Sequence, residues 1–399
     1  MKVLYIHQYF KTPKEPGGTR SYWISRELVK RGHKVVMITG SSKAHPETAT
    51  EEIDGIEVHY IKNPYSNNMG AAARIKSFLK FMWKAIKEGK KQKDVDLVFA
   101  TSTPLTTGAV ALALKTIKGW RYVFEVRDLW PEALIQEGVN NPVVVWMLRL
   151  LEKMTYKKAE HIISLSPGME EGVLKVGTPK SKSSMVPNMS KPDKFFPHEV
   201  SKDIIREFGI EISKFNVIHF GSMGASNGLA YIVEAAKVAK ERGINDINFI
   251  FLGYGSTEPM LKSLTKEYGL DNVQFLGNHP MQTVSEIVNC CDASITSFNN
   301  VPILATNSPN KLFDSLSAGK PIIVNSAGWT KDLVEKDDCG FFVDPENPGD
   351  FIDKLIRYKD DKETLERWSK NARRLSEEVF DKKILSAKVA DVLENAIKK

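Results

Sequence analysis

The chain has 399 residues, a length that predicts two domains of ordinary size, each able to bury its own core. Its composition is that of a soluble globular chain without low-complexity tracts, which excludes fibrous and disordered classes. The formal net charge of +7 is not gathered in a single block of the kind that marks a nucleic-acid-binding tail. We therefore expect no nucleic-acid partner.

The beginning of the chain and its cysteines indicate the compartment. Residues 1–7 resemble a short strand and lack the long apolar core and cleavage site of a signal peptide. No apolar run approaches the length that crosses a bilayer. Cys290, Cys291 and Cys339 show no metal-ligand spacing and are expected to be reduced core residues. These features predict a cytoplasmic protein.

In the N-terminal half, predicted strands alternate with predicted helices. A loop with Gly17 and Gly18 follows the first strand and leads into a helix that ends near Lys30. The elements expected after it are strands at 34–39, 96–100, 122–126 and 161–165, and helices at 105–118 and 143–158. Strands separated by helices at this spacing predict βαβ units and a parallel sheet.

A proline-rich segment, 186–197, is the expected linker to a second α/β series. Its strands are expected at 217–220, 248–252, 273–276, 293–296 and 322–325. We expect domains at 1–187 and 198–380, and a C-terminal helical segment at 381–399 that packs back on the first domain. Two doubly wound, Rossmann-like domains would face a central cleft at the carboxyl ends of their strands.

The segment Ser308 to Pro321 is the most informative one. It places Lys311 and Asp314 in the first turns of a predicted helix, after Pro309. A helix N-terminus offers unpaired amides and partial positive charge to a phosphate, and Lys311 adds a full charge. Asp314 could accept hydrogen bonds from sugar hydroxyls. The segment predicts a nucleotide-sugar diphosphate site; the alternative is an ordinary helix with a solvated lysine and aspartate.

Glycine turns follow three predicted strands, at residues 17–18, 221–224 and 253–255. Glycine lets a ligand approach the backbone closely, although most glycines after a strand only form a turn. None of the three matches the dinucleotide fingerprint or the phosphate loop that ends in Gly-Lys-Ser/Thr. Dehydrogenase and ATPase functions are therefore disfavoured.

Charged residues also gather at the carboxyl end of the predicted strand 122–126. Arg127 and Asp128 stand there between Glu125 and Glu132, where side chains of a parallel sheet point into a ligand crevice. We expect a site, and the alternative is that the four charges only pair with one another.

The segment Arg74 to Lys93 predicts an amphipathic helix with seven lysines and one arginine. Its apolar positions are Ile75, Phe78, Leu79, Met82 and Ile86. Such a helix is typical of an interfacial anchor on anionic lipid, but it could equally be a surface helix whose apolar face packs on the sheet.

In this order, the motifs make the chain resemble the retaining glycosyltransferases of family 4, which have the GT-B fold. The resemblance runs over nearly the full length. It rests on the opening strand, on Pro309 to Pro321, and on the segments 17–18, 32–35, 127–131, 187–188, 221–228, 252–255 and 275–277. Within the family, the chain looks most like the bacterial subgroup that builds O-antigen and capsule repeat units, including L-fucosamine transferases.

The resemblance assigns roles and also shows departures. The family usually has arginine and lysine on the diphosphate where this chain has Ser222 and Asn227, and two glutamates where it has Thr306 and Asp314. The Gly17–Gly18 loop is implied to approach the diphosphate, and a histidine usually precedes Asp128. The candidate donor-binding residues are Gly17, Gly18, Gly221, Ser222, Asn227, Gly253, Gly277, Asn278, Thr306, Ser308, Pro309, Asn310, Lys311, Leu312 and Asp314. The candidate catalytic residues are Arg127, Asp128 and Lys311.

The implied activity is retaining transfer of a sugar, such as an N-acetylated 6-deoxy hexose like L-FucNAc, from a UDP-sugar to a lipid-linked saccharide in surface polysaccharide synthesis. Lys311 would compensate for the missing cations. No protein nucleophile, cofactor or metal is implied, and the protein would associate peripherally with the inner face of the cell membrane. The alternatives are a UDP-N-acetylhexosamine 2-epimerase and a non-catalytic nucleotide-sugar-binding protein.

Overall fold

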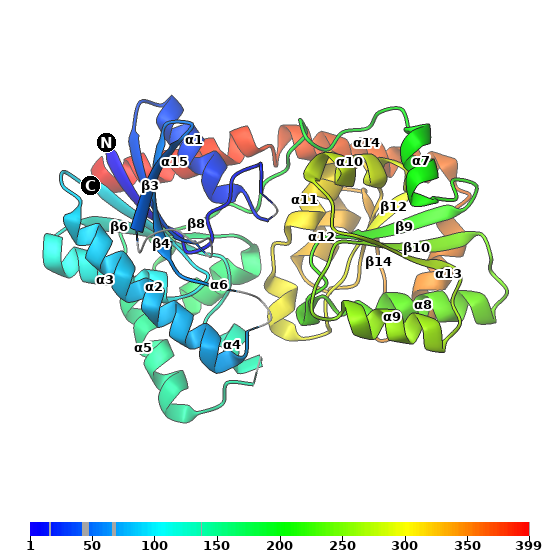
Figure 1. Ribbon diagram of the computed structural model, residues 1–399, viewed down its shortest axis with the longest axis horizontal. Helices are drawn as coiled ribbons and strands as arrows, with labels where there is room; N and C mark the ends of the chain where they lie inside the picture. The colour runs from blue at the N-terminus through cyan, green and yellow to red at the C-terminus, as the bar shows by residue number, and fades with distance from the viewer. Residues whose placement is uncertain (16, 42–47, 66–68, 137, 399) are drawn as a thin grey trace. The chain divides into compact units, whose positions relative to one another are not determined.

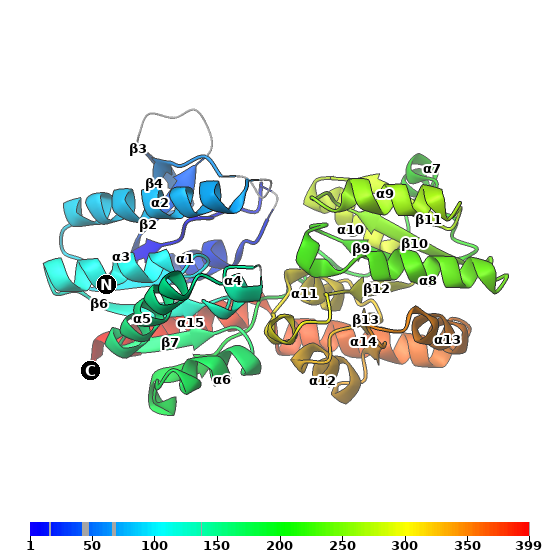
Figure 2. The same cartoon turned by 90° about the horizontal axis from the view of Figure 1, so that it is seen from below.

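The computed structural model describes residues 1–15, 17–41, 48–65, 69–136 and 138–398. Contacts divide the chain into two compact units, which we call unit 1, Met1–Pro187 with Lys382–Lys399, and unit 2, Asn188–Asp381. Each unit is a sheet of mostly parallel strands covered by helices on both faces, which confirms the predicted fold class (Figures 1 and 2). The terminal residue Lys399 of the expected segment 381–399 lies outside the described residues.

Unit 1 contains an eight-stranded sheet in the order β3-β4-β2-β1-β5-β6-β7-β8. Its strands are β1 (Lys2–Ile6), β2 (Lys34–Ser41), β3 (Thr48–Ile53), β4 (Ile56–Lys62), β5 (Leu97–Thr101), β6 (Arg121–Val126), β7 (His161–Ser164) and β8 (Ser183–Met185). All neighbours pair in parallel except β3, which is antiparallel to β4 at the edge. This hairpin and the short strand β8 add to the strands that the sequence predicts.

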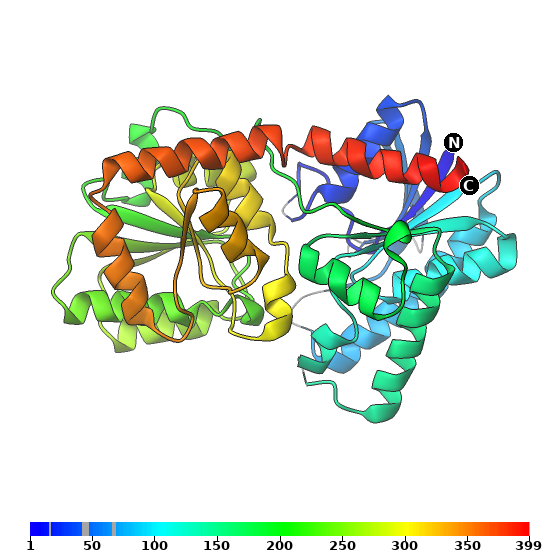
Figure 3. The same ribbon diagram turned by 180° about the vertical axis from the view of Figure 1, so that it is seen from behind.

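The helices of unit 1 form two layers. They are α1 (Arg20–Lys30), α2 (Ala71–Lys91), α3 (Thr106–Lys118), α4 (Glu132–Gln136), α5 (Pro142–Lys158), α6 (Pro167–Lys175), the 3-10 turn η1 (Lys180–Lys182) and α15 (Lys382–Lys398). On one face of the sheet, α2 packs beside α3 and α3 beside α5. On the other face, α15 packs along α1 and crosses β5, β6 and β7 (Figure 3).

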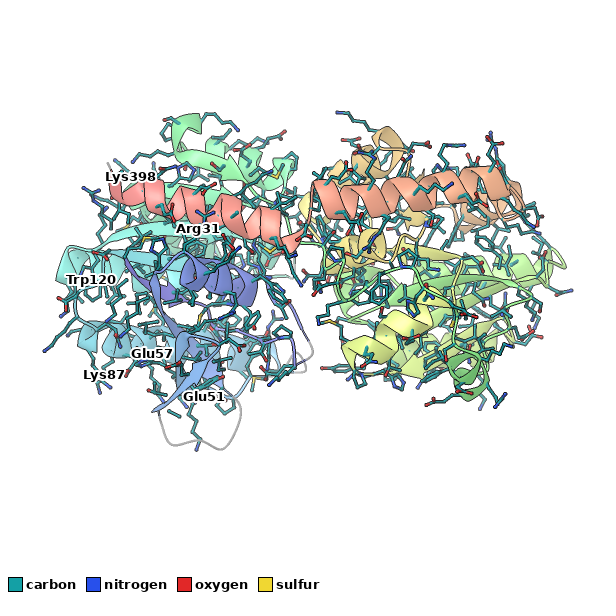
Figure 4. All side chains as sticks on the ribbon, turned by 90° about the horizontal axis from the view of Figure 1, so that it is seen from above. Arg31, Glu51, Glu57, Lys87, Trp120 and Lys398 are labelled. Atoms are coloured by element: carbon teal, nitrogen blue, oxygen red, sulfur yellow. The ribbon has the colours of Figure 1, made fainter. Side chains whose placement is uncertain are left out.

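Ion pairs hold α15 to α1. The guanidinium of Arg31, which is labelled in Figure 4 at the end of α1, lies 2.7 Å from the Asp391 carboxylate and 3.3 Å from that of Glu394. His33 lies 2.8 Å from the same Glu394 carboxylate. The last helix of the chain therefore belongs to the unit that contains its first strand.

Unit 2 contains a six-stranded parallel sheet in the order β11-β10-β9-β12-β13-β14. Its strands are β9 (Phe215–Phe220), β10 (Ile247–Leu252), β11 (Val273–Gly277), β12 (Ala293–Thr296), β13 (Ile322–Val324) and β14 (Gly340–Phe342). Its helices are α7 (Lys202–Phe208), η2 (Ala225–Asn227), α8 (Ala230–Glu241), α9 (Glu258–Glu267), α10 (Met281–Asn289), η3 (Pro302–Thr306), α11 (Asn310–Ser317), α12 (Trp329–Lys336), α13 (Pro348–Tyr358) and α14 (Lys362–Glu378). Alternate residues of β10 enter different apolar clusters, Phe249 and Phe251 in one and Ile250 and Leu252 in the other, because successive side chains of a strand point to opposite faces.

Helix α2 shows which part of the predicted amphipathic segment faces the core. Phe78 is only 5% exposed and Phe81 is fully buried, so neither is available to a membrane. The burial of Phe78 agrees with the alternative that the apolar face packs on the sheet, whereas Ile75 and Leu79 of the same predicted face are exposed. Within the part of the chain that the structure describes, no helix is both long and apolar enough to span a bilayer.

Candidate functional site

Two glycine loops of unit 2 lie against each other at the carboxyl ends of β9 and β10. The amide of Gly221 donates to the Leu252 carbonyl, and the amide of Met223 donates to the Tyr254 carbonyl. A Cβ on Gly253 would lie 1.9 Å from the Gly221 carbonyl oxygen, and Gly253 has φ +137°. Only glycine fits there, because the contact is with backbone that cannot give way. The Gly253 amide in turn donates to the carbonyl of Gly277, at the end of β11.

Helix α11 presents its N-terminus at the same edge of the sheet. No side chain caps it, and Pro309 occupies the position before the first turn. Among the residues that the structure describes, the amides of Asn310 and Lys311 have no hydrogen-bond partner, whereas the Leu312 amide donates to the Pro309 carbonyl. Free amides at a helix N-terminus favour a bound anion.

The side chain of Lys311 extends from α11 to the loop after β9. Its Nζ donates to Asn227 Oδ1 at 2.8 Å and lies 3.5 Å from His219 Nε2. Asn227 in turn donates through Nδ2 to the Ser222 carbonyl, which fixes the direction of its amide. The ammonium therefore lies beside Asn227, the position at which the family resemblance leads one to expect a lysine.

The electrostatics of this cluster favour an anion. No carboxylate pairs with Lys311 among the described residues, and burial lowers the pKa of Lys311 to about 7. Burial, and then the charge of Lys311, lower the pKa of His219 well below its usual value, so this imidazole stays neutral. A desolvated cation that has only neutral partners gains more than a solvated one from a phosphate placed beside it.

Asp314, the residue expected at the ribose, has a protein partner. Lys191 Nζ lies 2.8 Å from its Oδ1 and 3.2 Å from its Oδ2, and both side chains are largely buried. Burial raises the pKa of Asp314, and Lys191 opposes that rise. A sugar hydroxyl that reached Asp314 would have to share its carboxylate with Lys191.

The segment that carries Lys191 runs along α11. The Asn188 amide donates to Ser308 Oγ at 3.1 Å, Ser190 Oγ donates to the Phe313 carbonyl, and the Lys191 amide donates to Ser317 Oγ. Ser308 Oγ thus helps to hold this segment against the start of α11 as an acceptor. The prolines of residues 186–197 predict a linker, but residues 186–191 are buried.

The remaining expected donor residues lie around this cluster. The Thr306 hydroxyl donates to the Ile303 carbonyl at 2.7 Å inside η3, and Asn278 is exposed beyond the end of β11. The structure thus brings Gly221, Ser222, Asn227, Gly253 and Gly277 together with the start of α11. Gly17 and Gly18 belong to unit 1, so their approach to a diphosphate stays a prediction.

Unit 1 has its own polar cluster, at the carboxyl ends of β1, β5 and β6. The Arg127 amide donates to Ser102 Oγ at 2.8 Å, and Arg127 Nη1 lies 3.4 Å from His7 Nε2. Because arginine can only donate, His7 Nε2 accepts and Nδ1 carries the proton toward Ser21 Oγ, 2.8 Å away. Asp128 accepts a hydrogen bond from the Thr103 hydroxyl.

The four charged residues at this strand end, Glu125, Arg127, Asp128 and Glu132, do not pair only with one another. Glu125 is buried against Arg20 at 2.9 Å, and Glu132 pairs with Arg149 at 2.8 Å. Glu125 also accepts from the Thr101 hydroxyl. Arg20 further donates to the carbonyls of Val186 and Pro187, so Glu125 has a structural role. Arg127 and Asp128 remain the site candidates of this strand end.

Three residues of these clusters were not predicted from the sequence: His7, His219 and Lys191. The two histidines stand at or next to the carboxyl ends of β1 and β9, where polar residues of a parallel sheet meet ligands, and this position is the signal that could have identified them. For Lys191 the sequence carries no such signal, because its partner lies on a helix far along the chain.

The described residues form no candidate metal centre. Over residues 1–15, 17–41, 48–65, 69–136 and 138–398, the structure contains no group of three or more histidine, cysteine or acidic side chains that could hold a metal ion. The expectation of a metal-free reaction stays a prediction.

Two family models match consecutive parts of the chain. Residues 17–189 match the "Glycosyl transferase 4-like domain", and residues 200–375 match "Glycosyl transferases group 1". Their boundary falls near the division between unit 1 and unit 2.

Sequence relatives carry related descriptions. A probable glycosyltransferase, WbjE, of Pseudomonas aeruginosa is 22% identical over 313 residues, 76% of each chain. The UDP-Gal:alpha-D-GlcNAc-diphosphoundecaprenol alpha-1,3-galactosyltransferase of Escherichia coli is 27% identical over 200 residues, 48% of this chain and 49% of that one.

Solved structures share the fold over the whole chain. Sucrose-phosphate synthase from Thermosynechococcus elongatus superposes with a TM-score of 0.79 at 16% identity, over 100% of this chain and 99% of that one. HepE of Anabaena, solved in complex with UDP and glucose, has a TM-score of 0.71 at 17% identity, over 99% of each chain. At these identities, the likeness concerns the fold alone.

Proposed function

The chain is a glycosyltransferase of the GT-B type, and from this premise we propose that it transfers a sugar from a UDP-sugar whose diphosphate binds at the start of α11. One observation carries the proposal: the ammonium of Lys311 lies beside Asn227 with no carboxylate partner among the described residues, next to the free amides of Asn310 and Lys311. Two amides and one desolvated cation supply what an anionic diphosphate requires.

Lys311 takes the place of one of the two cations that family members usually carry in the loop after β9, the lysine at position 227. A lysine on α11 and an asparagine at 227 bring an ammonium to the loop position where a lysine at 227 would otherwise supply one. The positive charge would thus come from a different residue, Lys311, but act at the same place in the loop. We propose this exchange as the reason why Ser222 and Asn227 are compatible with activity.

The proposed reaction retains the anomeric configuration. The bond between the anomeric carbon and the diphosphate oxygen breaks, the acceptor oxygen bonds to that carbon on the same face, and the acceptor's hydroxyl proton passes to the departing diphosphate. Lys311 and the α11 amides would stabilise the charge that grows on the leaving group, and such preorganised stabilisation supplies the greatest part of the rate enhancement in many enzymes. No protein nucleophile, metal or cofactor takes part in this proposal.

We propose a lipid-linked saccharide as the acceptor and an N-acetylated 6-deoxy sugar such as L-FucNAc as the donor sugar. The E. coli relative, by its description, acts on a diphosphoundecaprenol-linked GlcNAc. Thr306 offers only neutral hydrogen bonds where glutamate is usual, which suits a different hydroxyl pattern on the donor sugar. Arg127 and Asp128 would contact the acceptor.

A lipid-linked acceptor implies work at the inner surface of the cell membrane, and we propose peripheral attachment there through helix α2. Its exposed side carries lysines at 76, 80, 87, 90 and 91. Basic residues near an anionic surface each contribute about 1 kcal/mol to attachment.

The function is tested by incubating the purified protein with a panel of UDP-sugars and membrane extract as the acceptor source, with and without EDTA. Transfer that survives EDTA, with the anomeric configuration retained in the product, supports the proposal. A C2 epimer formed without acceptor would instead identify an epimerase. UDP binding measured by calorimetry, without turnover of any donor, would identify a non-catalytic binding protein.

A further inference from the structure

The guanidinium of Arg127 is a cation of unit 1 that lacks an anionic partner among the described residues. Its Nη1 lies 3.4 Å from His7 Nε2, and its backbone amide donates to Ser102 Oγ at 2.8 Å. Across the part of the chain that the structure describes, its Nε and Nη2 groups have no hydrogen-bond partner. Arg127 is partly exposed, so a ligand can reach these donors.

The two glutamates closest to Arg127 in sequence do not neutralise it. Glu125 pairs with the buried Arg20 at 2.9 Å, and Glu132 pairs with Arg149 at 2.8 Å. A guanidinium offers a planar fork of donors that fits two oxygens of a carboxylate or a phosphate. The charge and the fork of Arg127 are therefore available to a ligand.

His7 holds this guanidinium in place. Because arginine can only donate, His7 Nε2 accepts, and His7 Nδ1 donates to Ser21 Oγ, 2.8 Å away in the first turn of α1. Burial, and then the charge of Arg127, lower the pKa of His7 well below its usual value, so the imidazole stays neutral. A neutral acceptor fixes the direction of the guanidinium without cancelling its charge.

Unit 2 holds Lys311 in a similar way. The ammonium of Lys311 lies 3.5 Å from Nε2 of His219, which is also a buried and neutral imidazole. In each unit, the histidine stands at or next to the carboxyl end of the first strand, β1 or β9. The arrangement in unit 2 belongs to the cluster proposed for the donor diphosphate. The similar arrangement in unit 1 favours a second anion.

We propose that Arg127, held by the imidazole of His7, binds an anionic oxygen group of the acceptor, a phosphate or a carboxylate. The inference rests on the proposed function, in which Arg127 contacts the acceptor. The anion would be the diphosphate of a lipid-linked saccharide or the carboxylate of an acidic sugar. The Asp128 carboxylate accepts from the Thr103 hydroxyl, so the acceptor would meet a hydroxyl-binding group beside an anion-binding one.

Binding of three synthetic acceptor probes tests the proposal without turnover. They are GlcNAc joined through a diphosphate to an octyl chain, octyl glucuronide and octyl GlcNAc, which carry a diphosphate, a carboxylate and no charge. With and without UDP, the wild type should bind one of the charged probes about tenfold or more tightly than the neutral probe, because charge-assisted hydrogen bonds are the strong ones. Tighter binding of the diphosphate probe would identify the lipid linkage as the source of the anion, and tighter binding of the glucuronide would identify an acidic sugar.

Variants make the assignment specific. Arg127→Met should lose the preference for the charged probe, whereas Arg127→Lys should keep part of it, because an ammonium retains the charge but not the fork. His7→Leu should weaken the preference by about threefold or more, and His7→Gln, whose amide oxygen can accept, should restore it. Arg206→Met, at an exposed arginine of unit 2, is the matched control and should bind the probes as the wild type does.

Equal affinities of the wild type for charged and neutral probes would overturn the proposal. An unchanged preference in Arg127→Met would also overturn it, once thermal unfolding shows that the variant is folded. The same preference in folded His7→Leu as in the wild type would overturn the positioning role of His7. UDP affinity, measured by calorimetry on Lys311→Met, reports on the proposed function, so either conclusion can fail alone.

Discussion

The strongest prediction concerns the proton on Lys311. Burial lowers the pKa of its ammonium to about 7, so half of the free protein carries the charge at pH 7 and about one molecule in a hundred at pH 9. A diphosphate charge about 4 Å away contributes about 4 kcal/mol at an effective dielectric of about 20, which raises the pKa of the bound lysine by about three pH units. UDP binding should therefore take up a proton.

The expected magnitude follows from this linkage. If UDP binds only the protonated form, its affinity should fall about 50-fold between pH 7 and pH 9, or about 2.3 kcal/mol. The phosphate of UDP titrates near pH 6, so its own ionisation contributes little over this range. Calorimetry at pH 8 in buffers of different ionisation enthalpy should show about one proton taken up per UDP bound.

Variants make the assignment specific. Lys311→Met should bind UDP weakly, and its affinity should depend little on pH above 7. Its activation free energy for transfer should rise by about 2 to 4 kcal/mol, as on removal of one oxyanion donor. Lys336→Met, at an exposed lysine of α12, is the matched control. A wild-type affinity that is constant from pH 7 to pH 9, or the same pH dependence in Lys311→Met, would refute the reasoning.

Three other predictions concern single side chains. Lys191→Met leaves the Asp314 carboxylate buried without a counter-charge, so the free energy of unfolding should fall by about 3 to 5 kcal/mol. The control Lys194→Met, at an exposed lysine, should be nearly neutral. Equal urea midpoints for Lys191→Met and the wild type would show that the pair contributes nothing to stability. Burial, and then Glu132, raise the pKa of Glu152 to about 8, above its unfolded value. The contribution of Glu152 to stability is therefore complete below about pH 4.5 and is lost as pH rises to 8, with a slope of at most about 1.4 kcal/mol per pH unit. Glu152→Gln should flatten the pH dependence of the urea midpoint across that range, and Glu171→Gln, at an exposed residue, should not. Asp128→Asn should depress transfer and leave UDP affinity nearly unchanged, and a large loss of UDP affinity would instead place Asp128 at the donor.

Much of the fold could be predicted from local sequence. Apolar strands of four to six residues between amphipathic helices have few alternatives to βαβ units, and the Pro309–Lys311 turn marks a helix N-terminus whether or not a ligand binds there. The β3–β4 hairpin escaped prediction because an edge hairpin within a parallel series has no periodicity that distinguishes it from a loop.

The amino-acid sequence by itself determined the two α/β series and the basic character of α2. Tertiary structure decided which groups meet. Lys311 reaches Asn227, and Lys191 neutralises Asp314. It also decided that Phe78 of α2 is buried while Leu79 beside it is exposed. The physical reason is that helical periodicity fixes which residues share a face, whereas the partner of that face, and the partner of each buried charge, comes from chain segments far away in sequence.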